Sequence, residues 1–299
     1  MAEVQAPQVA AVTRPRLRRL ARSLRRNPVA LISLVVLVAI VVIALAAPAL
    51  APHDPTMQSL RLRLRPPSWL PGGEPGHFLG TDPLGRDMLS RILHGARVSI
   101  LVGVLAVLIQ TVIGVGVGLV SGFYGGAVDN VFMRLADVQQ AIPFLVLVVA
   151  VAAVVGPSFL NTVLILGVTG WVTYGRVVRA QVLSLMQLEY VTASRALGGK
   201  DARVMLRHLL PNLVAPITVV ATLTISAMIL IEASLSFLGL GVPPPTPTWG
   251  GMVADGRNYL VNAWWVSVFP GTAIFVTVLV INLVGDWLRE ALDPTLRSS

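Results

Sequence analysis

The sequence contains no cysteine and a single lysine, Lys200, among its 299 residues. Without cysteine the chain can form no disulfide, no thiolate metal site and no cysteine nucleophile. Charged residues make up only 12% of the sequence, whereas a soluble domain carries about 25%. So few charges leave too little polar surface to cover a water-soluble globule, and an ordinary soluble fold is therefore excluded.

Sequence motifs for nucleotide and metal chemistry are missing as well. A phosphate-binding loop needs Gly-x-x-x-x-Gly-Lys-Ser/Thr, but Lys200 is followed by Asp201, and Ser194 stands where the first glycine belongs. No nucleophile elbow or metalloprotease helix is present. We therefore expect neither ATP hydrolysis nor a metal site in this chain. The four histidines, which show no metal-ligand spacing, are His53, His77, His94 and His208.

Hydrophobic residues make up 55% of the sequence and gather in long runs. A spanning helix needs about 20 mostly apolar residues, and six runs have about that length. They predict an all-α integral membrane protein with six transmembrane helices. The first run could instead be the core of a cleaved signal peptide, but it is longer than such a core and further spans follow it, which favours an uncleaved span. The runs are 29–47, 97–121, 131–155, 159–179, 213–237 and 263–285.

The basic residues form blocks beside the apolar runs. The net charge is +9, but blocks of this kind mark the cytoplasmic side of a membrane protein and do not make a nucleic-acid-binding face. We therefore expect both termini in the cytoplasm. The predicted segments are a basic cytoplasmic segment 1–28, a first transmembrane helix 29–51, a Pro-rich extracytoplasmic loop 52–94, a five-helix core 95–287 and a cytoplasmic tail 288–299.

A polar, amphipathic segment at about 181–211 separates the fourth run from the fifth. We expect two short helices in it, the first at about 185–197. Gly198 suits a left-handed helix end, Asp201 can cap the second helix, and Pro211 marks the end of that helix. A helix pair with one apolar and one charged face suits docking to a partner protein, and it equally suits the lipid surface.

Few polar side chains lie inside the apolar runs. Glu232 is deep in the fifth run, where a charge is costly unless it is paired, protonated or facing water. It either faces a translocation path or a subunit interface, or it is a structural carboxylate with Ser234 and Ser236 as local partners. A second polar group could line a cavity or contact a partner subunit, and it consists of Asp137, Gln139 and Gln140.

The end of the Pro-rich loop has the pattern of a turn, Asp82-Pro83-Leu84-Gly85, in which proline fixes one backbone angle and glycine supplies freedom. We expect a structural corner here and not a substrate contact, because turn chemistry alone explains the residue types. The residues of this corner are Gly80, Thr81, Asp82, Gly85, Arg86 and Asp87.

Four stretches carry a resemblance to one protein family. The segment with Thr192-Ala193-Ser194, Gly198 and Leu210-Pro211 resembles the coupling loop of ATP-binding-cassette (ABC) importer permeases. It departs from the usual motif because Thr192 replaces a glutamate and Ser194 replaces an alanine. The other three stretches resemble the second permease subunit of the dipeptide, oligopeptide and nickel branch, and they are 80–87, 232–241 and 286–294.

This resemblance implies the type I ABC importer permease fold and a coupling loop that sits in a groove on an ATPase subunit. It implies as partners a second, homologous permease, two ATP-binding subunits or one fused chain, and an extracytoplasmic substrate-binding protein. ATP and Mg²⁺ would bind the ATPase subunits, and no cofactor would bind this chain. The coupling residues would be Glu189, Ala193, Ser194, Gly198, Asp201, Arg203, Arg207, Leu210 and Pro211.

The implied function is uptake of dipeptides or oligopeptides across the cytoplasmic membrane of a prokaryote by alternating access. Nickel or another small solute is the alternative within the same branch. An ion-coupled carrier would be expected to show inverted repeats and several intramembrane charges, and a membrane enzyme would need a convergent acid–base or metal cluster. The sequence shows neither pattern.

Overall fold

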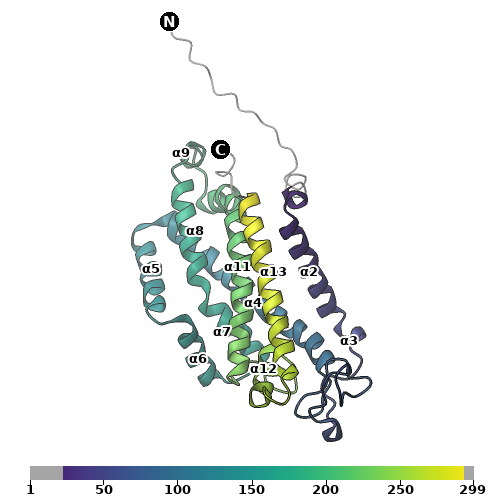
Figure 1. The fold of residues 1–299 in the computed structure, drawn as a ribbon. Coiled ribbons are helices and arrows are strands. Elements are labelled where there is room, and N and C mark those ends of the chain that lie inside the picture. The colour runs from purple at the N-terminus through teal and green to yellow at the C-terminus, as the bar shows by residue number, and fades with distance from the viewer. Residues whose placement is uncertain (1–22, 293–299) are drawn as a thin grey trace.

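The computed structural model of the chain describes residues 23–292 and is built of helices (Figure 1). Within these residues, β-structure is limited to one isolated bridge between Thr81 and Asp87. Most of the predicted segments 1–28 and 288–299 lies outside the described residues. The helices are α2 Pro28–Leu45, α3 Ala47–Leu50, α4 Met88–Tyr124, α5 Gly126–Gln140, α6 Phe144–Val155, α7 Phe159–Thr169, α8 Trp171–Leu185, α9 Glu189–Ala196, α10 Asp201–Arg203, α11 Leu210–Phe237, α12 Trp249–Gly256 and α13 Trp265–Leu292.

Four helices within residues 23–292 are long and apolar enough to cross a membrane. Three of them are α2, α4 and α13. The fourth joins α10, a π-helical turn at Val204–Leu209 and α11 into one helix of 37 residues, Asp201–Phe237. The all-α membrane fold is thus confirmed. The count of six spans stays a prediction, because the other two predicted spans are broken.

The third apolar run, predicted as one span at 131–155, forms two helices. α5 and α6 are bent by 85° relative to each other, and together they form a fifth candidate span. Pro143 has no N–H to donate and disfavours helical geometry in the residue before it. α5 therefore ends at Gln140, and Pro143 becomes the N-cap of α6.

The fourth apolar run is divided at Gly170, between α7 and α8. A Cβ atom on Gly170 would lie 2.2 Å from Cδ of Gln110 on α4. A side chain at this position would require the amide group of Gln110 to move, so glycine lets the broken helix pass close to α4. The break places the carbonyl end of α7 beside the side chain of Gln110.

The central helix of the bundle is α4, which contacts α2, α5, α7, α8 and α11. Small residues let α8 approach it closely, as in other membrane helix pairs. A Cβ on Gly114 would lie 2.4 Å from Cβ of Tyr174, and a Cβ on Gly118 would lie 2.5 Å from the carbonyl oxygen of Gly175. The α4–α8 seam is therefore a backbone-to-backbone contact that runs along the bundle.

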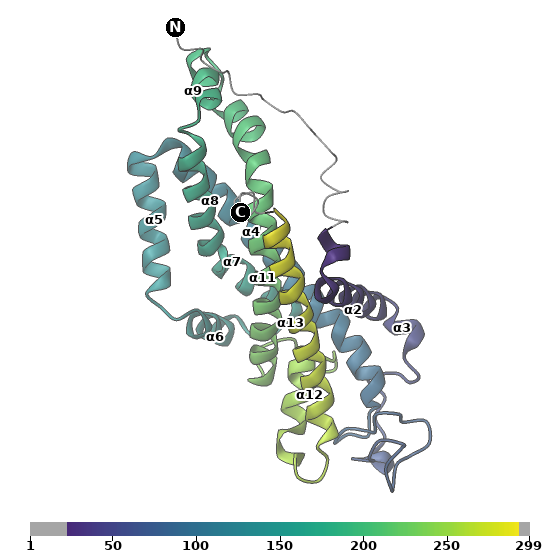
Figure 2. The same cartoon turned by 45° about the horizontal axis from the view of Figure 1, so that its top comes forward.

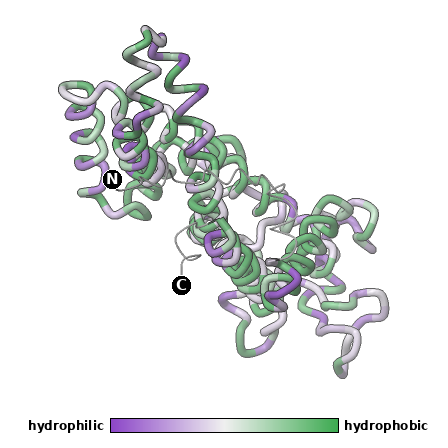
Figure 3. Tube along the Cα trace, turned by 90° about the horizontal axis from the view of Figure 1, so that it is seen from above, coloured by the Kyte–Doolittle hydropathy of each residue, from purple (hydrophilic) through white to green (hydrophobic). Residues whose placement is uncertain are grey.

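The two ends of the bundle are built from different parts of the chain. α9, the start of α2 and the end of α13 lie at one end, here called the inner end (Figures 1 and 2). α3, the loop that follows it and α12 lie at the other, here called the outer end. Hydrophobic residues dominate the helix traces between them (Figure 3), as a bilayer requires.

Candidate functional site

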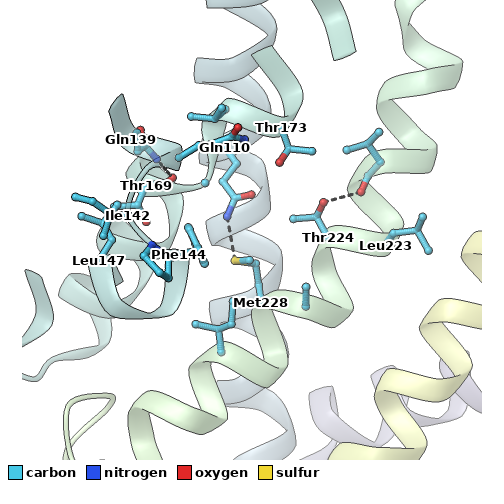
Figure 4. Close-up of a pocket in the computed structure, with 17 residues that line it drawn as sticks. Gln110, Gln139, Ile142, Phe144, Leu147, Thr169, Thr173, Leu223, Thr224 and Met228 are labelled. Atoms are coloured by element: carbon cyan, nitrogen blue, oxygen red, sulfur yellow. Dashed lines mark hydrogen bonds between the residues drawn. The ribbon is translucent and has the colours of Figure 1, made fainter. Parts of the chain in front are cut away.

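A cavity of about 650 Å³ is lined by residues of α4, the α5–α6 bend, the α7–α8 break and α11 (Figure 4). All the residues that line it are uncharged. Amide and hydroxyl side chains share the lining with larger apolar ones, a mixture typical of small-molecule sites. The polar lining residues are Gln110, Gln139, Gln140, Thr169, Thr173 and Thr224, and the larger apolar ones include Phe144, Leu147, Leu223, Met228 and Ile231.

Two glutamines fix the polar side of this cavity. Nε2 of Gln110 donates to the carbonyl oxygen of Leu166 at 2.9 Å and lies 3.0 Å from Sδ of Met228 (Figure 4). Gln139 donates to the carbonyl oxygen of Thr169. Both carbonyl groups belong to the last turn of α7, where the helix break leaves them without helical partners. The glutamines therefore join α4 and α5 to the break in α7–α8.

The polar group predicted at the start of the third run is divided by the structure. Gln139 and Gln140 line the cavity. Asp137 does not, because its side chain is 67% exposed and pairs with Arg176 of α8 at 2.6 Å. Sequence reasoning missed Gln110, although an amide in the middle of a long apolar helix is itself a signal of a functional position.

Glu232 lies outside the cavity lining. Its side chain is fully buried on α11, and Oε1 accepts a hydrogen bond from Oγ of Ser236 at 2.7 Å. Ser234 instead donates to the carbonyl oxygen of Leu230. Oε2 of Glu232 has no hydrogen-bond partner within residues 23–292. Its own helix therefore satisfies only one oxygen of this buried carboxylate, and both alternatives for Glu232 stay predictions.

The segment at 181–211 forms the tip of the inner end (Figure 1). Val191 of α9 and Val204 and Leu209 of the π-helical turn are fully buried. They pack on Phe123 of α4 and Val182 of α8, among other apolar residues of those helices. The tip is therefore attached to the bundle through its apolar side chains.

The outward face of the tip carries both apolar and charged side chains. Leu197 is 89% exposed and Leu206 is 61% exposed. Large apolar side chains grouped on a surface mark an interaction site. Leu188 and Tyr190 are exposed beside them. The charged residues on the same tip, also exposed, are Glu189, Asp201, Arg203 and Arg207.

The helix boundaries in this tip correct three predictions. The first helix, α9, begins at Glu189 and not near residue 185, because residues 186–188 form a turn. Lys200 and not Asp201 is the N-cap of α10. Pro211 does not end a helix but lies in the first turn of α11, where a missing N–H is tolerated because the π-helical turn precedes it.

The end of α9 has the geometry that Gly198 suggested. Gly198 has a φ of +78°, in the left-handed region that glycine adopts at low cost. The N–H of Gly199 donates to the carbonyl oxygen of Ser194 at 3.0 Å. Of the motif residues, Ser194 is half-buried, and Ala193 is exposed.

α8 connects the inner tip to the cavity. Val172 and Thr173 in its first turn line the cavity, and Leu185 at its end packs in the apolar cluster under α9. A helix of 15 residues is about 22 Å long. Arg179 in its middle holds α5 through Asp129, with Nη2 2.5 Å from Oδ2. A displacement of the tip would therefore move the wall of the cavity.

The predicted corner at the outer end is a buried ion network. Oδ2 of Asp82 accepts from Nε of Arg86 at 2.6 Å and also from Arg91. Both arginines reach Asp255 of α12, with Nη2 atoms 3.0 and 3.2 Å from its Oδ2. Arg91 and Asp255 were not predicted, because no sequence signal relates α12 to a loop more than 160 residues earlier.

Tight turns hold the rest of this corner. Gly80 and Gly85 have φ values of +77° and +72°, and a Cβ on Gly85 would lie 1.8 Å from the carbonyl oxygen of Ser59. Thr81 is fully buried and accepts from the backbone N–H of Arg65 at 2.8 Å. Asp87 caps α4 by accepting from the N–H of Ser90 at 2.7 Å.

Two of the four histidines and one residue of the predicted corner meet at this end. His53, His77 and Asp87 each offer one ligand atom, and these atoms lie within 4.8 Å of one another. The three residues therefore form a potential metal-ligand grouping, while the expectation that this chain holds no metal site stays a prediction. Spacing along the sequence gave no sign of it, because an irregular loop brings the residues together.

Comparison with known proteins gives consistent matches over nearly the whole chain. Residues 114–298 match the family described as binding-protein-dependent transport system inner membrane component, and residues 16–67 match the N-terminal TM domain of oligopeptide transport permease C. The di/tripeptide transport system permease protein DppC of Pseudomonas aeruginosa is 46% identical, covering 93% of this chain and 92% of that protein. The oligopeptide transport system permease protein OppC of Bacillus subtilis is 41% identical, covering 91% and 88%.

The fold has a counterpart among solved structures. A chain from inward-facing conformations of the MetNI methionine ABC transporter superposes with a TM-score of 0.56, covering 69% of this chain and 98% of that chain. The sequence identity is 19%, so this likeness concerns the fold alone. It agrees with the type I importer permease fold that the sequence predicted.

Proposed function

The chain belongs to the family of binding-protein-dependent transport system inner membrane components, and on this premise we propose that it is a permease subunit of an ABC importer for dipeptides or oligopeptides. As a family member with several apolar helices it is a multi-pass protein of the inner membrane. It would work by alternating access, in which a cavity opens to one side and then to the other. Peptide is the substrate class because the most similar relatives named above are di/tripeptide and oligopeptide permeases.

The proposed assembly contains several further components. A second permease would complete the pathway, two ATP-binding subunits or one fused chain would bind ATP and Mg²⁺ at the inner end, and an extracytoplasmic protein would deliver the peptide. This chain would bind no cofactor and hydrolyse no ATP itself. The exposed apolar face of the α9 tip, with Leu197 and Leu206 outermost, would rest on the ATPase subunit.

The observation that carries this proposal is the position of α8. One end of α8 lines the cavity, and its other end lies beneath α9. The α4–α8 seam, close at Gly114 and Gly118, holds α8 against the central helix. Closure of the ATPase subunits would displace the tip, and α8 would carry that displacement to the cavity wall.

The cavity lining favours a peptide over the alternatives. Glutamine and threonine side chains can donate to and accept from peptide amide groups. No lining residue is histidine, aspartate, glutamate or cysteine, the side chains that usually bind transition metals, so a nickel ion finds no ligand set here. The same absence of titratable groups from this cavity disfavours an ion-coupled carrier.

A single substitution at the tip tests the proposal in the assembled transporter. Leu197→Asp should leave folding intact because the side chain is 89% exposed, but it places a charge in the proposed docking surface. We expect loss of co-purifying ATPase subunit and at least a tenfold fall in peptide uptake by proteoliposomes.

Val261→Asp is the matched control, because Val261 is 94% exposed at the outer end. It should leave ATPase co-purification unchanged. Equal ATPase recovery and uptake for Leu197→Asp and the wild type would contradict the docking surface.

A further inference from the structure

The cluster of His53, His77 and Asp87 lies where the outer loop begins and ends, and the proposed transport mechanism makes no use of it. Nδ1 of His77 lies 2.9 Å from Oδ1 of Asp87, and Nδ1 of His53 lies 3.8 Å from the same oxygen. The two imidazole rings are stacked, with centroids 4.5 Å apart. Three potential metal ligands therefore converge on one small volume.

Each of the three residues is held by its own backbone contacts. The N–H of His53 donates to Oγ of Ser90 at 3.1 Å, and the N–H of His77 donates to the carbonyl oxygen of Glu74 at 3.2 Å. Asp87 uses Oδ2 to cap α4, which leaves Oδ1 directed at the two histidines. The cluster is thus built from the first turn of α4 and both ends of the loop.

One ligand atom in the cluster has no partner. Nδ1 of His53 is buried, and in the described part of the chain it has no hydrogen-bond partner. A buried ring nitrogen without a partner is unfavourable and calls for an explanation, such as an ion. The rest of the His53 side chain is 38% exposed, so the ring has room to turn and a small ion has a route inward.

We propose that His53, His77 and Asp87 bind one borderline divalent transition-metal ion, for which Zn²⁺ is the test ion. Two imidazole nitrogens and one carboxylate oxygen form a three-ligand set that leaves a position for water. Ligand atoms at about 2.0–2.1 Å from zinc lie closer together than the 3.8 Å between His53 and Asp87. A turn of the half-exposed His53 ring closes this gap and opens the stacked pair.

The bound ion would join the two ends of the outer loop to α4. His77 would carry its proton on Nε2 so that Nδ1 is free for the metal, and the carboxylate of Asp87 would still cap α4 through Oδ2. The outer face of the permease would thereby become more rigid. This inference concerns the outer loop alone and does not depend on the proposed transport function.

The test uses the tag-free, full-length chain in lipid nanodiscs after removal of metal with EDTA. Zn²⁺ is titrated in competition with a chromophoric chelator, with Mg²⁺ as the negative control, and the thermal unfolding midpoint is measured with and without Zn²⁺. We expect one tight site for each chain and a rise in the midpoint with Zn²⁺, because an ion that binds the folded state stabilises it.

His53→Ala is the decisive variant, since Nδ1 of His53 makes no hydrogen bond whose loss would disturb the fold. Its Zn²⁺ affinity should fall by about tenfold or more, and the shift in the midpoint should vanish. His94→Ala is the matched control, because His94 lies nearby but contacts the carbonyl oxygen of Ser90 and not the cluster. It should bind Zn²⁺ like the wild type.

Asp87→Asn supplies a second variant, since asparagine can still cap α4 but carries no charge for the metal. It should also weaken Zn²⁺ binding. Equal Zn²⁺ affinity in His53→Ala and His94→Ala, or the absence of one-to-one binding in the wild type, would overturn the proposal and leave the cluster as a stacked histidine pair with His77 hydrogen-bonded to Asp87.

Discussion

The two ends of the bundle are held together by opposite kinds of interaction. At the outer end, buried charges hold the segments together, because Asp82 accepts hydrogen bonds from two buried arginines that also reach Asp255. At the inner end, apolar side chains such as Val191 and Val204 anchor the tip, and its charges and several leucines face outward. The outer end is therefore completed within the chain, whereas the inner end presents a surface that a partner would cover.

Replacing Asp82, the central carboxylate of the outer end, should destabilise the protein more than removing an exposed ion pair. Asp82→Asn leaves Arg86 and Arg91 buried with only Asp255 as counter-charge. Breaking a buried ion pair by removing one partner costs about 3–5 kcal/mol. The free energy of unfolding in detergent, with limited proteolysis of the loop, measures this loss.

Asp137→Asn is the control for that experiment, because it removes an exposed pair with Arg176. Exposed pairs contribute about 0–1 kcal/mol, so its unfolding should be nearly unchanged. Similar losses for Asp82→Asn and Asp137→Asn would mean that the outer end is not held by its buried charges.

Substitutions in the α4–α8 seam, which joins the two ends, should destabilise the protein less than Asp82→Asn. They should do so only where α4 and α8 touch. Gly118→Ala places a Cβ 2.5 Å from the carbonyl oxygen of Gly175, so α4 and α8 must separate, at a cost of about 1–3 kcal/mol. Gly116→Ala, two residues away, meets nothing within 4 Å. It should be neutral or slightly stabilising, because alanine favours the helix by about 1 kcal/mol over glycine.

Thermal unfolding and peptide uptake of these two variants check the seam together. Gly118→Ala should lower both the unfolding midpoint and uptake, because α8 is the connection between tip and cavity. If Gly116→Ala were as damaging as Gly118→Ala, the effect would come from the loss of glycine itself and not from the contact with α8.

The sequence predicted the long helices well and the breaks poorly. Apolar runs located α2, α4, α11 and α13, because a helix that spans a bilayer needs about 20 consecutive, mostly apolar residues. α4 nonetheless begins at Met88, well before its apolar run, because Asp87 caps it. Hydropathy does not show the 85° bend, which follows from Pro143, or the break at Gly170, which lies against the distant residue Gln110.

Candidate site residues were predictable where the signal was local. Gln139 and Gln140 stood out as polar residues beside an apolar run, and the glycine pair after α9 indicated a helix end. Gln110 carried the same kind of signal and was overlooked. Asp255 and the meeting of His53 with Asp87 could not be predicted, since both depend on how irregular segments fold back on α4.

The central claim is that the α9 tip faces the cytosol, where an ATPase subunit can reach it. The chain contains no cysteine, so single cysteines introduced at Leu197 and Val261 can be labelled without background. A membrane-impermeant maleimide should label Val261→Cys but not Leu197→Cys in intact cells, and the reverse in inverted membrane vesicles. Labelling of Leu197→Cys in intact cells would contradict the account, because the tip would then lie on the side of the membrane where no ATP is available.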